Sequence, residues 1–386
     1  ISSIITETSL SDWKIYFKWA LLNRNASLLN SEFEKQNFYF YRTVLSGVEE
    51  MEPRWKRGVS VVSGRLGEII GKVYVEKHFD QNAKNRMLEL VENLREAYRI
   101  SIEELDWMGD STKVQAQEKL KKFRPKVGFP NEWKDYSNLV ISKDDLIGNI
   151  KNSTLDRTIK NREKLGKPID REEWGMTPQT VNAYYSPLLN EIVFPAGILQ
   201  PPFFNMEADD AVNYGAIGAV IGHEMGHGFD DKGSKYDGNG ELRNWWTESD
   251  RKQFEERTKK LIDQYNGYTV VDGTPVNGEF TQGENIGDLA GIVIAYKAYQ
   301  LSKKGSQAPI IDGLTGDQRF FFGWATIWGS KSTDEQLIRQ IKTDPHSPGE
   351  FRANGPLVSM PEFVNLYDVK PGDGMYIDPN DRVKIW

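Results

Sequence analysis

Apolar residues recur at helical spacing along the first third of the chain. Over residues 85–100 the apolar positions follow one helix face, and the same spacing appears nearer the start. The positions concerned are Met87, Val91, Leu94 and Tyr98 in the later segment and Trp13, Phe17, Ala20 and Leu21 in the earlier one. We therefore predict that residues 1–120 form part of an all-helical lobe.

A basic run over residues 119–126 ends this helical region at Pro125. Lysine and arginine are favoured at the C-terminal end of a helix by the helix dipole. We therefore expect a solvated helix end here rather than a nucleic-acid contact. The break suits a domain boundary, and we assign residues 121–386 to a second lobe.

The second lobe has a mixed pattern. Residues 126–130 suit a short strand, and Asp144 and Asp145 suit the first turn of a helix whose apolar positions run from 146 to 159. Two β-branched and aromatic runs, 181–185 and 191–194, are separated by a turn with Pro187 and predict a hairpin. One strand of that hairpin is a candidate open edge.

Longer helices are predicted further along the second lobe, over residues 207–228, 248–266, 284–303 and 317–328. The first of them is rich in glycine, which permits close packing against a neighbour. The predicted fold class is mainly α with a small β-sheet, that is, an α+β lobe joined to part of an all-α lobe.

Composition excludes several classes of protein. The 386 residues include 49 basic and 56 acidic side chains, a net charge of −7, so we expect no nucleic-acid partner. The longest apolar stretch, residues 214–222, is far shorter than the roughly 20 residues that cross a bilayer, so we expect no membrane span. The absence of cysteine excludes disulfides and thiolate metal sites.

The most specific motif is His223-Glu224-Met225-Gly226-His227, which contains two of only four histidines in the chain. Four residues are a little over one helical turn, so both imidazoles project from one face, as two ligands of one zinc ion require. Glu224 can then approach a metal-bound water from the side. The alternative, a pair of ordinary surface histidines, conflicts with the apolar residues at 219–222, because unpaired buried histidines are costly.

A catalytic zinc ion needs a third protein ligand and an open position. No further histidine is nearby, so a carboxylate is expected. Glu284, 57 residues after His227, opens a predicted helix, and Asp288 lies one turn further along the same face. Such a pair suits one zinc ligand plus one acceptor for the ring N–H of a ligating histidine. Elsewhere a Glu and an Asp one turn apart usually form a solvated face, but this helix is otherwise apolar.

These residues and several flanking segments resemble the neprilysin and endothelin-converting enzyme family. The matching segments are Val181–Tyr185, Ile192–Phe204, Phe229–Asp231, Gly283–Asp288, Lys342–Gly349, Phe351–Gly355 and the terminal Trp386. The resemblance implies a zinc endopeptidase that acts on oligopeptides, with one Zn²⁺ per chain. It also implies a thermolysin-like catalytic lobe facing a helical lobe across a closed chamber.

Site roles follow from the resemblance, residue by residue. It implies that the zinc ligands are His223, His227 and Glu284, that Glu224 is the general base and that Asp288 is the acceptor behind a zinc ligand. It further implies that His346 donates to the tetrahedral oxyanion, that Arg352 clamps a substrate carbonyl, and that Asn182 and Ala183 offer backbone partners to an extended substrate. A protonated imidazole aimed at developing negative charge is chemically reasonable in that role.

The resemblance also implies a pocket for the residue that follows the cut bond. The matching positions are Ile198, Phe203, Val220, Ile327 and Trp328. We therefore expect cleavage before a bulky hydrophobic residue, with a broad substrate range because apolar pockets discriminate weakly. Plain core packing is the alternative for these five residues.

Family members are longer and carry an N-terminal segment that completes the helical lobe. We expect this chain to correspond to part of a full-length family member, and we expect the N-terminal segment that completes the helical lobe to be its partner. The cysteine-free composition suggests a bacterial protein, in the cell envelope, the periplasm or secreted rather than cytoplasmic. Two alternatives stay open. The first is a protein that retains the peptidase fold without its activity, either as a binding or assembly protein or as an inactive fragment. The second is an aminopeptidase, although the sequence has no Gly-x-Met-Glu-Asn-like segment to bind the substrate amine.

Overall fold

The computed structural model describes residues 2–386, which form two compact units. The first contains the chain up to Leu66 together with Asp135–Ile169 and Ser332–Arg339. The second contains Gly67–Lys134, Asp170–Lys331 and Gln340–Trp386. Every candidate site residue lies in the second unit.

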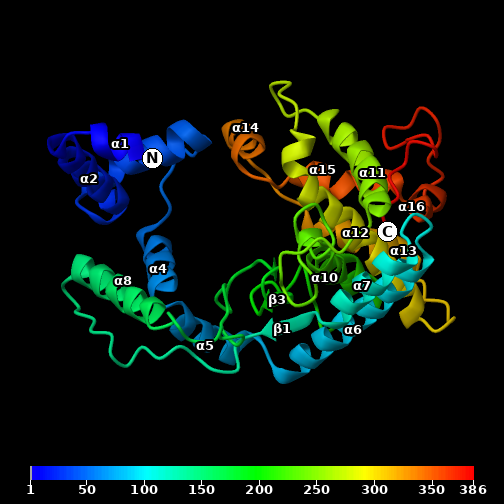
Figure 1. Ribbon diagram of the computed structural model, residues 1–386, viewed down its shortest axis with the longest axis horizontal. Helices are drawn as coiled ribbons and strands as arrows, with labels where there is room; N and C mark the ends of the chain where they lie inside the picture. The colour runs from blue at the N-terminus through cyan, green and yellow to red at the C-terminus, as the bar shows by residue number, and fades with distance from the viewer. Residues whose placement is uncertain (1) are drawn as a thin grey trace. The chain divides into compact units, whose positions relative to one another are not determined.

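The first unit is helical (Figure 1). Its elements are α1 (Ser2–Glu7), α2 (Leu10–Asn25), the 3₁₀ turn η1 (Ala26–Leu28), α3 (Ser31–Phe38), the π-turn η2 (Tyr39–Val44), α4 (Arg54–Arg65), α8 (Leu146–Arg162) and the start of α14 (Asp334–Thr343). Asp145 caps α8 by accepting from the backbone N–H of Gly148, as predicted for the start of that helix. All residues of α2 are described, and none of its side chains is buried.

The second unit contains most of the regular structure. Its N-terminal helices are α5 (Gly67–His78), α6 (Gln81–Glu104) and α7 (Asp110–Lys121), and its strands are β1 (Arg124–Gly128), β2 (Tyr184–Ser186) and β3 (Glu191–Pro195). The later elements are α9 (Asp210–Asn213), the π-turn η3 (Tyr214–Gly218), α10 (Ala219–Gly226), η4 (Gly233–Lys235), α11 (Glu248–Asn266), α12 (Gly278–Ser302), α13 (Gly316–Ile327), α15 (Gly349–Asn354), η5 (Leu357–Ser359) and α16 (Pro361–Leu366).

The sheet has the strand order β1-β3-β2. β1 runs parallel to β3, with Arg124 opposite Glu191, and β2 runs antiparallel to β3, with Tyr184 opposite Val193. Every residue of the central strand β3 is buried. The predicted hairpin is confirmed, and among the described residues β2 is an edge strand of the sheet. The mainly helical fold with a small sheet is likewise confirmed.

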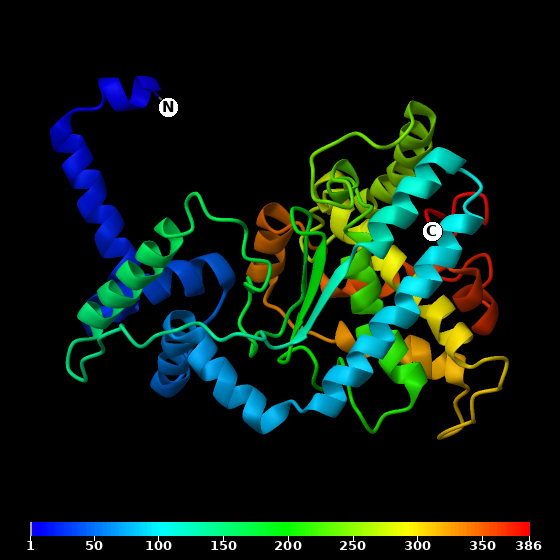
Figure 2. The same ribbon diagram turned by 60° about the horizontal axis from the view of Figure 1, so that its bottom comes forward.

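Helices α10 and α12 cross at backbone contact in the middle of the second unit, and α6 runs alongside α12 (Figures 1 and 2). A Cβ atom on Gly222 would lie 2.8 Å from the carbonyl oxygen of Gly291, and one on Gly291 would lie 2.4 Å from that of Ala219. Only glycine allows this approach. The Tyr98 hydroxyl of α6 donates to the Gly222 carbonyl at 2.8 Å and adds a third helix to the crossing.

Two helix boundaries differ from the predictions. The helix expected over 207–228 begins at Asp210 and contains the π-turn η3, in which one additional residue per turn interrupts the α-helical spacing. The helix expected from Glu284 begins at Gly278, because the Asn277 side chain accepts the backbone N–H of Phe280 and caps it there. Glu284 therefore lies in the second turn of α12.

The expectation of a solvated basic helix end holds for Lys121 and Lys122, which are exposed, but is wrong for Lys119 and Lys126. Lys119 is 1% exposed and donates to two backbone carbonyls, and Lys126 is 6% exposed and pairs with Glu191 at 2.9 Å. Both lysines are covered because the face of α7 that carries Lys119 and the strand β1 pack inside the second unit. The division of the chain into functional lobes near residue 120 stays a prediction; in the structure, α5, α6 and α7 belong to the second unit.

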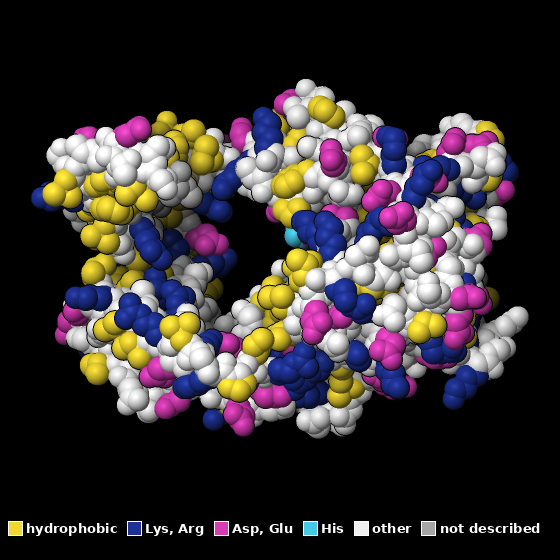
Figure 3. Space-filling view, in the orientation of Figure 1, with side chains coloured by type: hydrophobic (Ala, Val, Ile, Leu, Met, Phe, Trp, Pro, Cys, Tyr) yellow, Lys and Arg dark blue, Asp and Glu magenta, His cyan; other side chains and the backbone are white. Residues whose placement is uncertain are grey.

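On the face drawn in Figure 3, lysine and arginine are interspersed with aspartate and glutamate over the second unit. Among residues 2–386, no helix combines the length and the apolar character that crossing a bilayer requires.

Candidate active site

Two helices bring three candidate metal ligands together. His223 lies on α10 and His227, one turn later, is the residue that caps its C-terminal end; the crossing with α12 places Glu284 against both rings. The distances from Glu284 Oε2 are 3.2 Å to His223 Nε2 and 3.6 Å to His227 Nε2. One ligand atom of each residue lies within 4.8 Å of the other two.

This arrangement fits a zinc ion. Zinc bonds to nitrogen and oxygen of about 2.1 Å in a tetrahedron set the ligand atoms about 3.4 Å apart, close to the two distances above. Within the described part of the chain, Glu284 Oε2 is buried and makes no hydrogen bond of good geometry, although the Nε2 atoms of His223, His227 and His346 lie 3.1 to 3.6 Å from it; a bound cation would supply its partner. Two imidazoles and one carboxylate are also the ligand types that zinc accepts.

Each histidine is oriented from behind by a carboxylate. His223 Nδ1 lies 2.9 Å from Asp288 Oδ1, and His227 Nδ1 lies 2.8 Å from Asp230 Oδ2. A proton on Nδ1 leaves the Nε2 lone pair of each ring for a metal. The structure thus assigns Asp288 to His223. Asp230 was missed in the sequence, although its position three residues after His227 was a usable signal.

Arg352 is engaged with one of these carboxylates. Its Nε and Nη2 atoms donate to the two oxygens of Asp288, each at 2.7 Å, and its guanidinium lies 4.1 Å from the centre of the Trp328 ring. Burial acts to raise the pKa of Asp288, but Arg352 and His223 outweigh it and hold that pKa below its ordinary value. Arg352 therefore supports the carboxylate behind His223; its role as a substrate clamp stays a prediction.

Glu224 lies beside the histidines on α10 and is 6% exposed. Burial raises the pKa of this carboxyl group. A carboxylate of raised pKa next to a metal site is suited to accept a proton from water at neutral pH.

The structure brings His346 to the same place. Its Nε2 lies 3.1 Å from Glu284 Oε2, and its Nδ1 lies 2.7 Å from Asp344 Oδ1. The contact with Glu284 raises the pKa of His346. The following residue, Ser347, is buried and donates to Asn285 Oδ1 at 2.8 Å, which ties the loop of His346 to α12.

The expected substrate-contacting residues are less closely gathered. Asn182 and Ala183 precede the edge strand β2, and the Ala183 N–H donates to the Asn182 side chain at 2.9 Å. Ile198 is buried in the hydrophobic core. The other four residues are partly buried and pack against this core: Phe203, Val220, Ile327 and Trp328. Their joint role as a pocket stays a prediction. A cavity of about 190 Å³ borders His227 and Glu284 and is also lined by Tyr185 and Phe280.

The site of HExxH-type zinc metallopeptidases has two histidines four residues apart on one helix and a glutamate from a second helix as ligands. A further glutamate, next to the first histidine, does not bind the metal. The comparisons with known proteins agree with this class. Family models described as peptidase family M13 match residues 1–130 and 182–383. The chain belongs to peptidase family M13, which confirms the resemblance to neprilysin and endothelin-converting enzyme.

Relatives match along the whole chain. Endothelin-converting enzyme 1 of Mus musculus is 36% identical over 401 residues, and Neprilysin-11 of Caenorhabditis elegans is 38% identical over 402; both alignments cover 100% of this chain, but 51% and 47% of the respective relative. The chain therefore spans about half the length of these relatives.

Solved structures extend the likeness to bacterial proteins. The zinc metalloprotease Zmp1 of Mycobacterium tuberculosis, in complex with an inhibitor, superposes with a TM-score of 0.96 at 52% identity, covering 100% of this chain and 59% of that one. PepO from Lactobacillus rhamnosis superposes with a TM-score of 0.86 at 33% identity, covering 95% and 56%.

Proposed function

We propose that this chain carries the catalytic centre of a zinc-dependent endopeptidase that hydrolyses oligopeptides. The observation that supports this most directly is the joint placement of His223, His227 and Glu284 around a buried, unbonded carboxylate oxygen, with Glu224 beside them. Membership of family M13 supports the same reaction class.

The chain's own residues account for the proton transfers. Zinc, when bound, lowers the pKa of water and polarises the scissile carbonyl. Glu224 accepts a proton from the attacking water and passes it to the leaving amine, for which its raised pKa is suited. His346 donates to the oxygen that becomes negative in the transition state.

Substrate binding is proposed along the edge strand β2. An extended peptide can pair with an open strand edge, and Asn182 and Ala183 lie directly before β2. In this proposal Arg352 contacts a substrate carbonyl in addition to Asp288. A preference for a bulky hydrophobic residue after the cut bond would come from the set Ile198, Phe203, Val220, Ile327 and Trp328.

Exposed apolar side chains on α2 suggest a polypeptide partner. Ile15 is 67% exposed, Trp19 58% and Leu22 48%, and hydrophobic side chains gather over this part of the first unit (Figure 3). We propose that these side chains are covered by the N-terminal segment that completes the helical lobe in family members. Adding such a segment to the peptide-cleavage assay tests whether it raises activity.

The Glu224→Gln variant tests the proposed reaction, with Glu256→Gln on the exposed face of α11 as the matched control. Metal analysis should find about one zinc per chain in all three proteins. Cleavage of a short-peptide library should fall at least about 100-fold in Glu224→Gln and remain at the wild-type rate in the control.

The possible results separate the alternatives. A Glu224→Gln variant that cleaves at the wild-type rate would remove Glu224 as the base. A wild-type chain that binds zinc but cleaves no peptide, with or without the added segment, would favour the non-catalytic alternative.

A further inference from the structure

Lys119 is a deeply buried charge for which the proposed reaction has no use. It is 1% exposed, and the carboxylates of Asp230 and Asp237 act on its ammonium group through the electrostatic field. Three aromatic rings, those of Tyr185, Phe229 and Trp245, surround Nζ with centroids 5.7 to 5.9 Å away. Burial outweighs the attraction of Asp230 and Asp237 and lowers the pKa of Lys119 to about 7, so holding a charge here is costly.

The ammonium group contacts one short loop, residues 230–236, which directly follows the metal-binding helix. Nζ donates to the carbonyl oxygens of Gly233 and Tyr236, each at 2.7 Å. Hydrogen bonds from a charged donor are about twice as strong as neutral ones. Lys119 thus fastens this loop to the C-terminal turn of α7.

The same loop holds Asp230 in place behind His227. The backbone N–H groups of Lys232 and Gly233 donate to Asp230 Oδ1 at 2.8 and 2.7 Å, which leaves Oδ2 for His227 Nδ1. The loop also lies directly on the histidine backbone, since a Cβ atom on Gly233 would come within 1.7 Å of the His227 carbonyl oxygen. A displacement of Gly233 therefore moves the carboxylate that orients His227.

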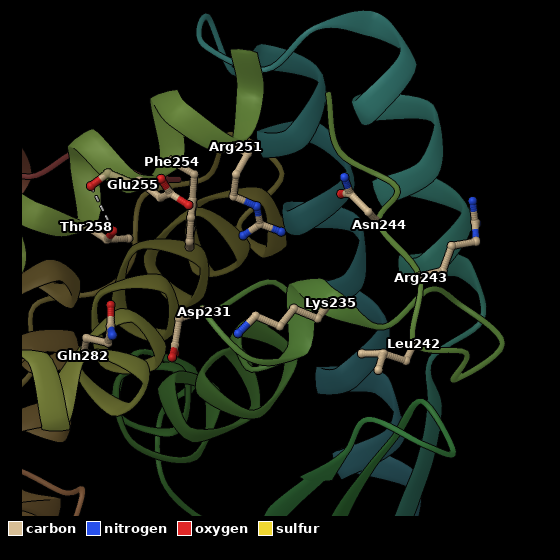
Figure 4. A pocket seen from close by; sticks show the side chains of 10 residues that line it. All are labelled: Asp231, Lys235, Leu242, Arg243, Asn244, Arg251, Phe254, Glu255, Thr258 and Gln282. Atoms are coloured by element: carbon tan, nitrogen blue, oxygen red, sulfur yellow. Dashed lines mark hydrogen bonds between the residues drawn. The ribbon is translucent and has the colours of Figure 1, made fainter. Parts of the chain in front are cut away.

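The opposite side of the loop borders a cavity. Asp231 and Lys235 line a cavity of about 590 Å³, and Arg251 points into it from α11 (Figure 4). One side-chain hydrogen bond crosses from α11 to the loop, from Arg251 Nη1 to Ser234 Oγ at 3.1 Å. The far end of the loop has other donors as well: the Arg243 N–H bonds the Lys235 carbonyl at 2.9 Å, and Trp245 Nε1 bonds the Tyr236 carbonyl at 3.1 Å. At the Gly233 carbonyl, next to Asp230, the donor from outside the loop is Lys119.

We propose that Lys119 is a positioning residue of the metal site: through the carbonyls of Gly233 and Tyr236 it holds the loop in which Asp230 orients His227. The inference rests on the proposed zinc site. It predicts that loss of the Lys119 ammonium weakens metal binding although Lys119 touches neither the metal nor a metal ligand.

The experiment measures zinc affinity by chelator competition and the visible absorption spectrum of the cobalt-loaded protein. The variants are Lys119→Met, Asp230→Asn and the double variant, with Lys122→Met on the exposed end of α7 as the control. Lys119→Met should weaken zinc binding about tenfold or more and alter the cobalt spectrum, as removal of groups behind a ligand does. Because both residues act through His227, adding Lys119→Met to Asp230→Asn should change the affinity less than about twofold.

The outcomes are distinct. Wild-type zinc affinity and cobalt spectrum in a folded Lys119→Met chain would overturn the inference while leaving the zinc site intact. A wild-type chain that binds no zinc would overturn the proposed function as well. If Lys119→Met does not fold, Lys119→Gln, which keeps an N–H donor, takes its place with a smaller expected loss. Failure of both to fold while Lys122→Met folds would make Lys119 a folding residue and overturn the inference.

Discussion

The buried pair of Arg352 and Asp288 offers a sharp test of how the site is held together. Arg352→Met keeps most of the side-chain volume and removes the guanidinium. Asp288 is 1% exposed on its side chain and Arg352 12%, so the carboxylate would remain buried with His223 as its remaining side-chain partner. Such an uncompensated charge is strongly destabilising.

The magnitude follows from the two hydrogen bonds that disappear. Each is a charge-assisted bond of 2.7 Å, worth about 1.5–3 kcal/mol, which gives roughly 3–6 kcal/mol for both. Breaking a buried ion pair by removing one partner usually costs about 3–5 kcal/mol. We therefore expect the free energy of unfolding to fall by about 4 kcal/mol, and Tm by roughly 8–16 °C at the 2–4 °C per kcal/mol typical of larger domains.

Urea and thermal unfolding of the metal-free chain, followed by tryptophan fluorescence, measure this loss. Arg99→Met is the control, because Arg99 is 42% exposed and pairs with Glu96 and Glu103 on the surface of α6. Such pairs contribute about 0–1 kcal/mol. The double variant Arg352→Met/Asp288→Asn should be more stable than Arg352→Met alone, since it no longer buries an unpaired charge.

Two results would refute this reasoning. A loss below about 1 kcal/mol in Arg352→Met would mean that the pair is not energetically coupled to the fold. A double variant less stable than Arg352→Met would mean that the remaining carboxylate is not the source of the destabilisation.

Two further predictions concern catalysis and acid stability. His346→Ala should lower kcat for peptide cleavage about 100-fold or more with KM and zinc affinity nearly unchanged, because in the proposed mechanism His346 donates to the oxygen that becomes negative in the transition state; an unchanged kcat would contradict this role. Burial acts to raise the pKa of Asp250, but hydrogen bonds from Thr112, Thr247 and the Gly109 N–H outweigh it and hold that pKa below its ordinary 3.8. The ionised carboxylate of Asp250 therefore stabilises the folded state above pH 3.8, and this contribution disappears as the pH falls below that value. Asp250→Asn should therefore lower the free energy of unfolding by about 1–3 kcal/mol at pH 7 and by less at pH 3, and an equal loss at both pH values would argue against this role.

The sequence predicts the local parts of the site well. The four-residue spacing of His223 and His227 is a property of a single helix, and the structure places both rings together. The hairpin that ends in the edge strand β2 follows from its β-branched runs and turn. Glu284 and Asp288 were reached from ligand chemistry and the apolar character of their helix. These inferences need only spacing and residue type.

Contacts between distant segments were beyond the sequence. The glycines of α10 indicated close packing, but nothing in the pattern identified Gly291 of α12 as the neighbour of Gly222. Lys119 was wrongly predicted to lie in solvent, because its partners are backbone carbonyls more than a hundred residues away. Every residue has a backbone carbonyl, so the pattern of side chains cannot indicate which carbonyls a lysine will contact. Arg352 was expected to face the substrate. Its two hydrogen bonds to Asp288 depend on how α12 and α15 pack together, which the sequence does not reveal.

The distribution of the site over the fold has a consequence for how such a protein can diverge. All three candidate ligands, Glu224 and the carboxylates behind both histidines lie in the second unit, on α10, α12 and the loop after α10. Mutations confined to the first unit therefore leave all of these side chains unchanged, so the first unit can diverge in sequence while the residues of the metal site are kept.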